Sequence, residues 1–246
     1  MKDKKECGQF FWEKPQKILV ILAHPDDPEF FCGGTIAKWV QSGHHVIYCL
    51  LTKGEKGINE FYFHEGDEDI VSLRLKEQKN AAAILGVTQI FYFNHPDGYL
   101  TPSMTLRRQV VKLIRKLQSD IVVGCDPTNY FIRDSYINHP DHRAAGQIVI
   151  DAIFPAAHNA FYFPDLNSQG YRPHKVKEVW LSLPNKANTT IDITDTWKIK
   201  IKALHEHKSQ IGDEKKFDER MLSRRVEGST EANPLFEEAF TRIILN

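Results

Sequence analysis

The chain has 246 residues, of which 41% are hydrophobic and 26% charged, a composition that suits a soluble protein with one large α/β domain or two small ones. Its 32 lysine and arginine residues balance 32 aspartate and glutamate residues, so the net charge is zero and favours neither nucleic acid nor an anionic membrane as a partner. Its 4 cysteines are scattered without a paired motif, which excludes a disulfide framework and favours free thiols.

The N-terminal segment is charged and lacks the apolar stretch of a secretory signal. No apolar run approaches the roughly 20 residues that a membrane span requires. We therefore expect a cytoplasmic protein.

Short apolar runs alternate with helical patterns along most of the chain. The first run, at residues 17–23, is almost entirely apolar, as is typical of a strand covered on both faces. A helical pattern at 29–41 follows it. The same alternation predicts further strands at 45–51, 89–93 and 120–125, and further helices at 69–85, 105–118 and 141–153.

The last part of the chain departs from this alternation. It predicts strands at 178–183, 189–193 and 237–245, a helix at 196–210, and a polar loop at 209–233 like the one expected at 54–69. Strands that alternate with helices predict an α/β fold with a Rossmann-like, mostly parallel sheet and helices on both faces. Without a repeat or a low-complexity linker, we expect a single domain over residues 1–246, with a core at about 15–155 and a C-terminal extension at about 156–246.

Two polar clusters fall where strands of this sheet should end. Segment 24–29 reads His-Pro-Asp-Asp-Pro-Glu and directly follows the first strand. Segment 139–142 reads His-Pro-Asp-His and lies after the fourth strand, at the start of a helix. Because ligands of open α/β sheets bind beyond the carboxyl ends of the strands, the two clusters can converge there.

Together the clusters contain the parts of a hydrolytic metal site. Zinc in such sites takes three protein ligands and leaves one position for water. Two imidazoles and a carboxylate would bind the metal, a second carboxylate would act as general base, and a third would fix the tautomer of a histidine. One cluster alone would more often be a turn or a helix cap, but two at strand ends favour the metal site.

Other residues carry weaker signals. Gly33 and Gly34 lack the fingerprint of a dinucleotide site, and we expect them to allow close packing of a helix. His205 and His207 are two residues apart in a predicted helix, so they face different ways, although His207 could contact a neighbouring site. The aromatic segment 61–63 could line a sugar pocket, belong to the core or form a subunit interface.

The clusters and their surroundings resemble the PIG-L/LmbE-like N-acetylglucosaminyl deacetylase family. AHPDDPEFFCGGT and INHPDHRAAG are similar to its two signatures, and LLTKGEKG, RLKEQKNAAAILG and NHPDGYL follow its pattern between them. The DPTNY and HKSQ segments are most similar to the diacetylchitobiose deacetylases of the family. The resemblance implies a zinc-dependent hydrolase that removes the N-acetyl group of an N-acetylglucosamine-type amino sugar or its conjugate, and a homo-oligomer, either a trimer or a hexamer.

Carried over residue by residue, the resemblance implies one zinc ion per chain, although the same donors suit other divalent ions. The implied metal ligands are His24, Asp27 and His142. The implied catalytic residues are Asp26 as general base, His139 as oxyanion donor or acid, and Asp141, which would orient His139. Arg74 and Asp97 match substrate-binding positions.

The sequence departs from the family at one position. Some members have a tyrosine two residues before the first histidine of the second signature, where this chain has Ile137 with Tyr136 beside it. Two other functions stay open: a metalloamidase of the same family that cleaves a larger amide, and a non-catalytic metal- or nucleotide-binding module. The presence of Asp26, which metal binding alone does not need, disfavours the second.

Overall fold

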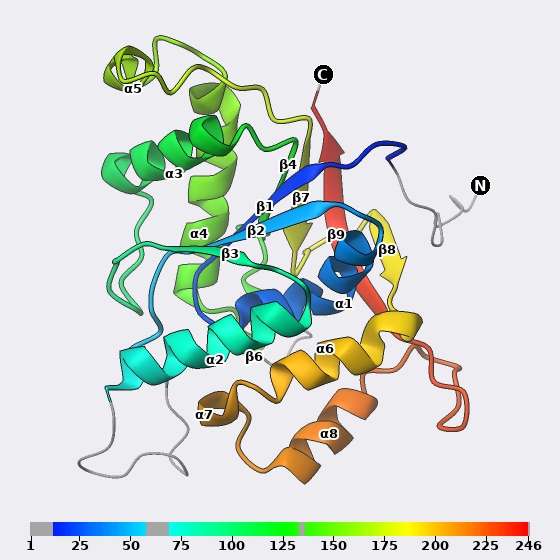
Figure 1. Cartoon of the computed structure of the whole chain (residues 1–246). Coiled ribbons are helices and arrows are strands. Elements are labelled where there is room, and N and C mark those ends of the chain that lie inside the picture. The colour runs from blue at the N-terminus through cyan, green and yellow to red at the C-terminus, as the bar shows by residue number, and fades with distance from the viewer. Residues whose placement is uncertain (1–11, 58–68, 133–135, 246) are drawn as a thin grey trace.

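The computed structural model describes residues 12–57, 69–132 and 136–245, so the aromatic segment 61–63 lies outside the described residues. A seven-stranded sheet in the order β3-β2-β1-β4-β7-β9-β8 forms the centre of the described part. Figure 1 shows helices packed on both sides of it.

Most of the sheet is parallel. The parallel strands are β1 (Lys17–Leu22), β2 (His45–Leu50), β3 (Gln89–Tyr92), β4 (Ile121–Cys125) and β7 (Glu178–Ser182). Antiparallel pairing adds β9 (Glu237–Ile244) beside β7 and β8 (Thr189–Asp192) beside β9. The order β3-β2-β1-β4-β7 is that of a Rossmann sheet, which confirms the predicted fold class. The strands of the predicted C-terminal extension continue this same sheet.

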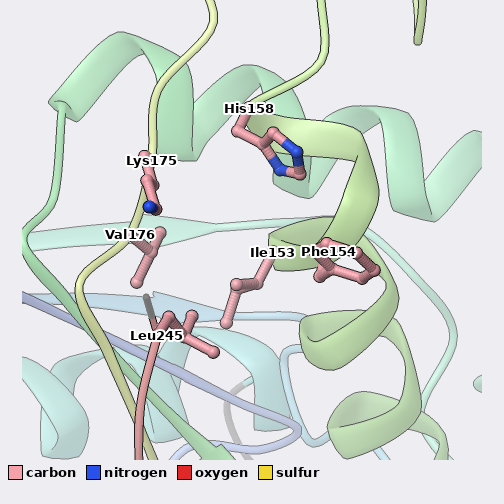
Figure 2. A pocket seen from close by; sticks show the side chains of 6 residues that line it. All are labelled: Ile153, Phe154, His158, Lys175, Val176 and Leu245. Atoms are coloured by element: carbon pink, nitrogen blue, oxygen red, sulfur yellow. The ribbon is translucent and has the colours of Figure 1, made fainter.

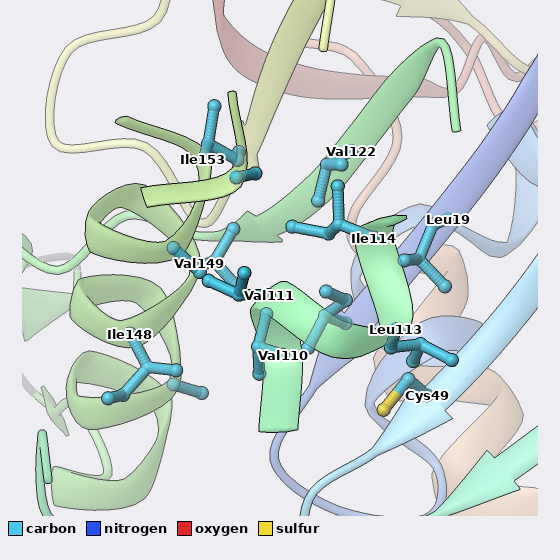
Figure 3. Close-up of a cluster of buried hydrophobic side chains, with 14 of the residues drawn as sticks. Leu19, Cys49, Val110, Val111, Leu113, Ile114, Val122, Ile148, Val149 and Ile153 are labelled. Carbon is cyan, nitrogen blue, oxygen red and sulfur yellow. The ribbon is translucent and has the colours of Figure 1, made fainter. Parts of the chain in front are cut away.

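Each strand of the centre is covered on both faces. Leu19 and Ile21 of β1 pack in one cluster with α3 (Met104–Leu117) and α4 (Pro140–Asp151), and Figure 3 shows part of it. The alternate residues of β1 pack in a second cluster with α1 (Asp27–Gln41), α2 (Ile70–Ile84) and α6 (Trp197–Leu204). This two-sided burial explains why the strands are apolar at every position rather than at every second one.

The predicted helix at 196–210 is wrong in its second half. α6 ends at Leu204, and a separate short helix, α7 (Lys208–Ile211), follows. The chain bends between them, and His207, in the bend, lies fully buried against α1.

The predicted loop at 209–233 is also wrong, because it contains α8 (Glu214–Leu222). Asp213 caps this helix by accepting a hydrogen bond from the Lys216 backbone N–H. Only Phe217 and Met221, one turn apart, are buried, so the apolar stripe was too narrow to identify from the pattern.

Several short elements were not predicted. They are the hairpin of β5 (Phe131–Ile132) and β6 (Tyr136–Ile137), the π-helical η2 (Ala152–Ala157), α5 (Pro164–Ser168) and the 3-10 helix η3 (Thr194–Thr196). None of the helices in the described part of the chain is long and apolar enough to cross a membrane.

Candidate active site

The first cluster forms a sharp turn between β1 and α1. β1 ends at Leu22, and α1 begins at Asp27 with Pro28 in its first turn, where no N–H is needed. Asp26, the residue before the helix, has a φ of 90°, in the left-handed region that costs a non-glycine residue about 1–3 kcal/mol. Backbone strain of this size is often found at functional sites.

The second cluster forms the start of α4. His139 precedes the helix, and its Nδ1 accepts a hydrogen bond of 3.1 Å from the backbone N–H of Asp141. This bond leaves Nε2 as the nitrogen of His139 that is available to other groups. The ring of His139 lies edge-on to that of His24, with 4.8 Å between the ring centroids.

The two clusters converge around His24 as predicted. His24 Nδ1 is 3.5 Å from Asp27 Oδ2, and its Nε2 is 3.0 Å from Asp97 Oδ1 and 3.3 Å from Asp141 Oδ2. His142 Nε2 is 3.1 Å from the other oxygen of Asp27. The carboxylate of Asp27 therefore lies between two imidazoles that come from separate loops.

These donors fit a divalent metal ion. Two groups of described residues have donor atoms within 4.8 Å of one another: His24, His139 and His142, and His24, Asp97 and Asp141. Imidazole nitrogens and carboxylate oxygens are the donors of hydrolytic zinc sites. Asp27 belongs to neither group but contacts His24 and His142 directly, so the set His24, Asp27 and His142 stays a prediction.

The electrostatics of the cluster also favour a cation. Burial by itself lowers the pKa of His24, but hydrogen bonds with Asp141, Asp27 and Asp97 raise it to about 12. Although burial opposes it, His142 and His24 hold the pKa of Asp27 well below its usual range. Carboxylates gathered around one imidazole create a strongly negative potential, which a proton or a metal ion can neutralise.

Arg74 holds the turn that carries Asp26. Its guanidinium is buried and donates to the backbone oxygens of Pro25 and Gly54 at 2.7 and 2.6 Å. It also contacts the carboxylate of Asp26 at 3.1 Å. Burial raises the pKa of Asp26, and the charge of Arg74 opposes that rise. Contact between Arg74 and a sugar stays a prediction, since both terminal nitrogens of the guanidinium already donate to protein groups.

Asp141 has partners other than the predicted His139. Its carboxylate accepts hydrogen bonds from the backbone N–H groups of Gly98 and Leu100, at 2.7 and 3.1 Å, in addition to its contact with His24. The first turn of α4 directs this side chain into the protein, while the side chain of His139 caps the helix. Burial and the neighbouring imidazoles of His24 and His142 lower the pKa of His139, so the structure favours its neutral ring.

Asp97, predicted near the substrate, contacts His24 itself. It is held there by the backbone N–H of Lys56, which donates to its Oδ2 at 3.0 Å, and by its own N–H, which donates to Glu55. His24 and Asp97 are far apart in the sequence, and only the packing of the loops after β1 and β3 brings them together.

Asn138 is a functional candidate that the sequence reasoning missed. It is fully buried, and its Oδ1 lies 3.0 Å from Nδ1 of His142, while its Nδ2 donates to the backbone oxygen of Asn129. A partner of this kind fixes the ring orientation and tautomer of a metal-binding histidine. Its only sequence signal is its place directly before the second cluster. Tyr136, two residues earlier, is exposed on β6.

A cavity of about 280 Å³ lies elsewhere in the molecule. Figure 2 shows its lining of Ile153, Phe154, His158, Lys175, Val176 and Leu245. It lies beside η2, which follows the end of α4 opposite to His139. None of the predicted site residues lines this cavity, so it carries no argument about the catalytic site.

Comparison with known proteins identifies the relatives of this chain. The family model for PIG-L, described as GlcNAc-PI de-N-acetylase, matches residues 19–153, which include both clusters. The chain is 35% identical over 199 residues to diacetylchitobiose deacetylase of Thermococcus kodakarensis, covering 81% of this chain and 72% of that protein.

Solved structures show the same fold. N,N'-diacetylchitobiose deacetylase from Pyrococcus horikoshii matches with a TM-score of 0.82 and 28% identity, over 94% of this chain and 85% of that one. A 4-carboxy-2-hydroxymuconate hydratase from Pseudomonas putida also matches, with a TM-score of 0.73 and 21% identity over 94% and 97% of the two chains. Since the fold alone also carries a hydratase, membership rests on the sequence matches. On the extent of those matches, the chain belongs to the PIG-L family.

Proposed function

We propose that the chain is a zinc-dependent N-deacetylase that removes the acetyl group from an N-acetylglucosamine-type amino sugar or its conjugate and releases acetate. The observation that carries the proposal is the convergence of His24, Asp27 and His142 beside Asp26. The deacetylase relatives with which the chain shares its sequence support the same reaction.

In this proposal His24, Asp27 and His142 hold the metal ion. The ion, when bound, supplies Lewis-acid activation of water and of the amide carbonyl. Asn138 fixes the orientation of the His142 ring, and the carboxylates of Asp97 and Asp141 fix that of the His24 ring.

Asp26 acts as the general base. Its carboxylate takes a proton from the attacking water as the oxygen bonds to the carbonyl carbon. When the carbon–nitrogen bond breaks, Asp26 returns this proton to the nitrogen of the departing amine, and the acetic acid that is left ionises to acetate. The raised pKa of Asp26, caused first by burial, makes it a stronger base than an exposed aspartate.

His139 stabilises the oxyanion. Because its Nδ1 accepts the backbone N–H of Asp141, the proton of the neutral ring is on Nε2, and that N–H can donate to the former carbonyl oxygen. Of the two roles that the resemblance implies for His139, a neutral oxyanion donor fits better than an acid, since the pKa of His139 is lowered by burial and by its imidazole neighbours.

An acetate-release screen tests the function. The zinc-loaded protein is incubated with N-acetylglucosamine, its β-linked dimer and N-acetylglucosamine glycosides, and acetate is measured against a chelator-treated sample. We expect release from at least one of these sugars, and only with metal. Cleavage of a larger acyl amide without acetate release would instead establish the metalloamidase alternative, and no hydrolysis of either class would contradict both.

We also propose a cytoplasmic location with a small-molecule substrate and no nucleic-acid or membrane partner. The support is the balanced charge of the chain and the state of the described cysteines. Cys32, Cys49 and Cys125 are buried free thiols, as expected in a reducing compartment.

A further inference from the structure

The backbone of Asp26 depends on groups other than its own side chain. Residues at this position usually cap the helix with their side chain, but the carboxylate of Asp26 makes no capping hydrogen bond and contacts Arg74 instead. Its φ of 90° is unfavourable for a residue with a Cβ. Such a conformation persists only where the surroundings fix it.

Gln78 of α2 provides one such contact. Its Oε1 accepts a hydrogen bond of 2.7 Å from the backbone N–H of Asp26. Its Nε2 donates to both carboxylate oxygens of Glu29, at 3.0 and 3.1 Å. These partners define the orientation of the amide, because a rotated amide would direct its NH₂ group at the N–H of Asp26 and its oxygen at a carboxylate.

His207 extends this row of hydrogen bonds into the C-terminal part of the chain. Its Nε2 lies 3.2 Å from Oε2 of Glu29. The side chains of His207, Glu29 and Gln78 are all completely buried, so water does not compete for their hydrogen bonds. His207 lies in the bend between α6 and α7, directly before the first residue of α7.

The face of α2 that packs against the Asp26 turn and α7 carries polar side chains. Arg74 and Gln78 are one helical turn apart and reach the same turn of chain, one through the side chain of Asp26 and the other through its backbone. Glu77, beside them, accepts hydrogen bonds from the N–H and Oγ of Ser209 at 2.8 and 2.6 Å. α2 thus connects the α7 segment to the turn that carries the general base.

The need to satisfy buried polar groups explains why Gln78, Glu29 and His207 pair with one another. It does not explain why they lie beside the backbone of Asp26. Buried polar groups must be satisfied somewhere, and an apolar core would meet the needs of packing without them. Here the row ends on the backbone N–H of the one residue in the turn that is both strained and assigned to proton transfer.

We infer that Gln78 is a positioning residue for catalysis, which fixes the backbone of Asp26 and is itself fixed by Glu29 and His207. The inference rests on the proposed function, in which Asp26 is the general base. Loss of the Gln78 amide releases the turn, so the carboxylate of Asp26 spends less time where it can take a proton from water.

Gln78→Leu nearly keeps the side-chain volume and removes all three hydrogen bonds of the amide. We expect kcat to fall about 10–100-fold, as for other residues that orient catalytic groups, with KM within about threefold of the parent. Activity is expressed per folded, metal-loaded molecule, so a loss of stability alone would not lower it. A crystal structure of the variant should show that Asp26 has left the left-handed conformation.

Exchanging the glutamine at 78 and the glutamate at 29 distinguishes an effect of the hydrogen-bond geometry from an effect of core packing. Gln78→Glu alone places a second carboxylate beside Glu29 and should lose activity. Combined with Glu29→Gln it keeps an acceptor for the N–H of Asp26 and restores a donor between the two side chains, and we expect recovery of about tenfold or more over the single variant. Gln147→Leu, on the exposed side of α4, is the control and should retain parental kcat.

The outcomes are distinct. Parental kcat in Gln78→Leu together with an unchanged Asp26 conformation would overturn the inference, as would a Gln78→Glu, Glu29→Gln variant no better than Gln78→Glu alone. If the parent releases no acetate from any substrate, the proposed function fails, and the conformation of Asp26 in the Gln78→Leu structure still decides whether Gln78 fixes it.

Discussion

Asp26 and Asp27 are adjacent in the sequence but contact different partners. The carboxylate of Asp27 lies between His24 and His142, whereas that of Asp26 faces Arg74. The left-handed backbone of Asp26 separates the two directions. One carboxylate can therefore bind a metal ion while the other remains available for proton transfer.

Asp26→Asn tests the role of the base. The amide cannot take a proton from water, so we expect kcat to fall about 10²–10⁴-fold while the metal content is unchanged. Metal analysis and turnover are measured on the same preparation, with Asp195→Asn at an exposed position as the control. A kcat within about threefold of the parent would remove Asp26 from this role.

Asp27 and His139 are the two candidates for the third metal ligand, since both lie near His24 and His142. If Asp27 is the ligand, Asp27→Asn should weaken zinc binding much more than His139→Ala, which should keep its zinc and lose about 10²–10³-fold in kcat. Zinc affinity is measured by competition with a chromophoric chelator. The reverse order of affinities would show that His139 binds the metal.

At the scale of elements, the site depends on how closely α4 packs on β4. A Cβ at Gly146 would lie 2.3 Å from the backbone oxygen of Cys125, and backbone cannot move aside as a flexible side chain can. Glycine at this position lets the helix approach the strand, and the start of that helix carries His139 and His142.

Gly146→Ala should therefore displace α4 and destabilise the protein by about 1–3 kcal/mol, the usual cost of overpacking. Denaturant unfolding at equilibrium measures the loss, and zinc affinity should weaken in the same variant because the proposed ligand His142 moves. Gln147→Ala, the exposed neighbour on the same helix, serves as control. Equal stability of the Gly146 and Gln147 variants would contradict the close approach.

At the scale of the whole molecule, several apolar side chains remain exposed. On and beside the β5–β6 hairpin they are Tyr130, Phe131, Tyr136 and Ile137, each more than half exposed. Exposed apolar residues grouped on one segment often mark an interface between proteins.

We predict that the chain forms a trimer or hexamer and that this hairpin contributes to the contact. Light scattering at micromolar concentration measures the mass, and Ile137→Lys should shift it towards the monomer if the hairpin is buried between subunits. Lys186→Ala, a change at another surface loop, should leave the mass unchanged. A single monomer peak from the parent chain would refute the oligomer.

The sequence by itself determined the α/β class, most strands of the sheet, most helices that pack on it, and the two clusters that the structure brings together. These features depend on short-range causes: apolar periodicity, turn-forming prolines and glycines, and the position of polar residues at strand ends. Strands such as β1 and helices such as α3 were predictable because their own residues specify them.

Only the tertiary structure decided which side chains meet. Asp97 contacts His24, and Asp141 takes its partners from the loop after β3 instead of from the neighbouring His139. The break after α6 and the contact of His207 with Glu29 likewise have no local signal. The physical reason is the same in each case: a buried polar side chain turns towards the partner that compensates its desolvation, and that partner is supplied by an element distant in sequence.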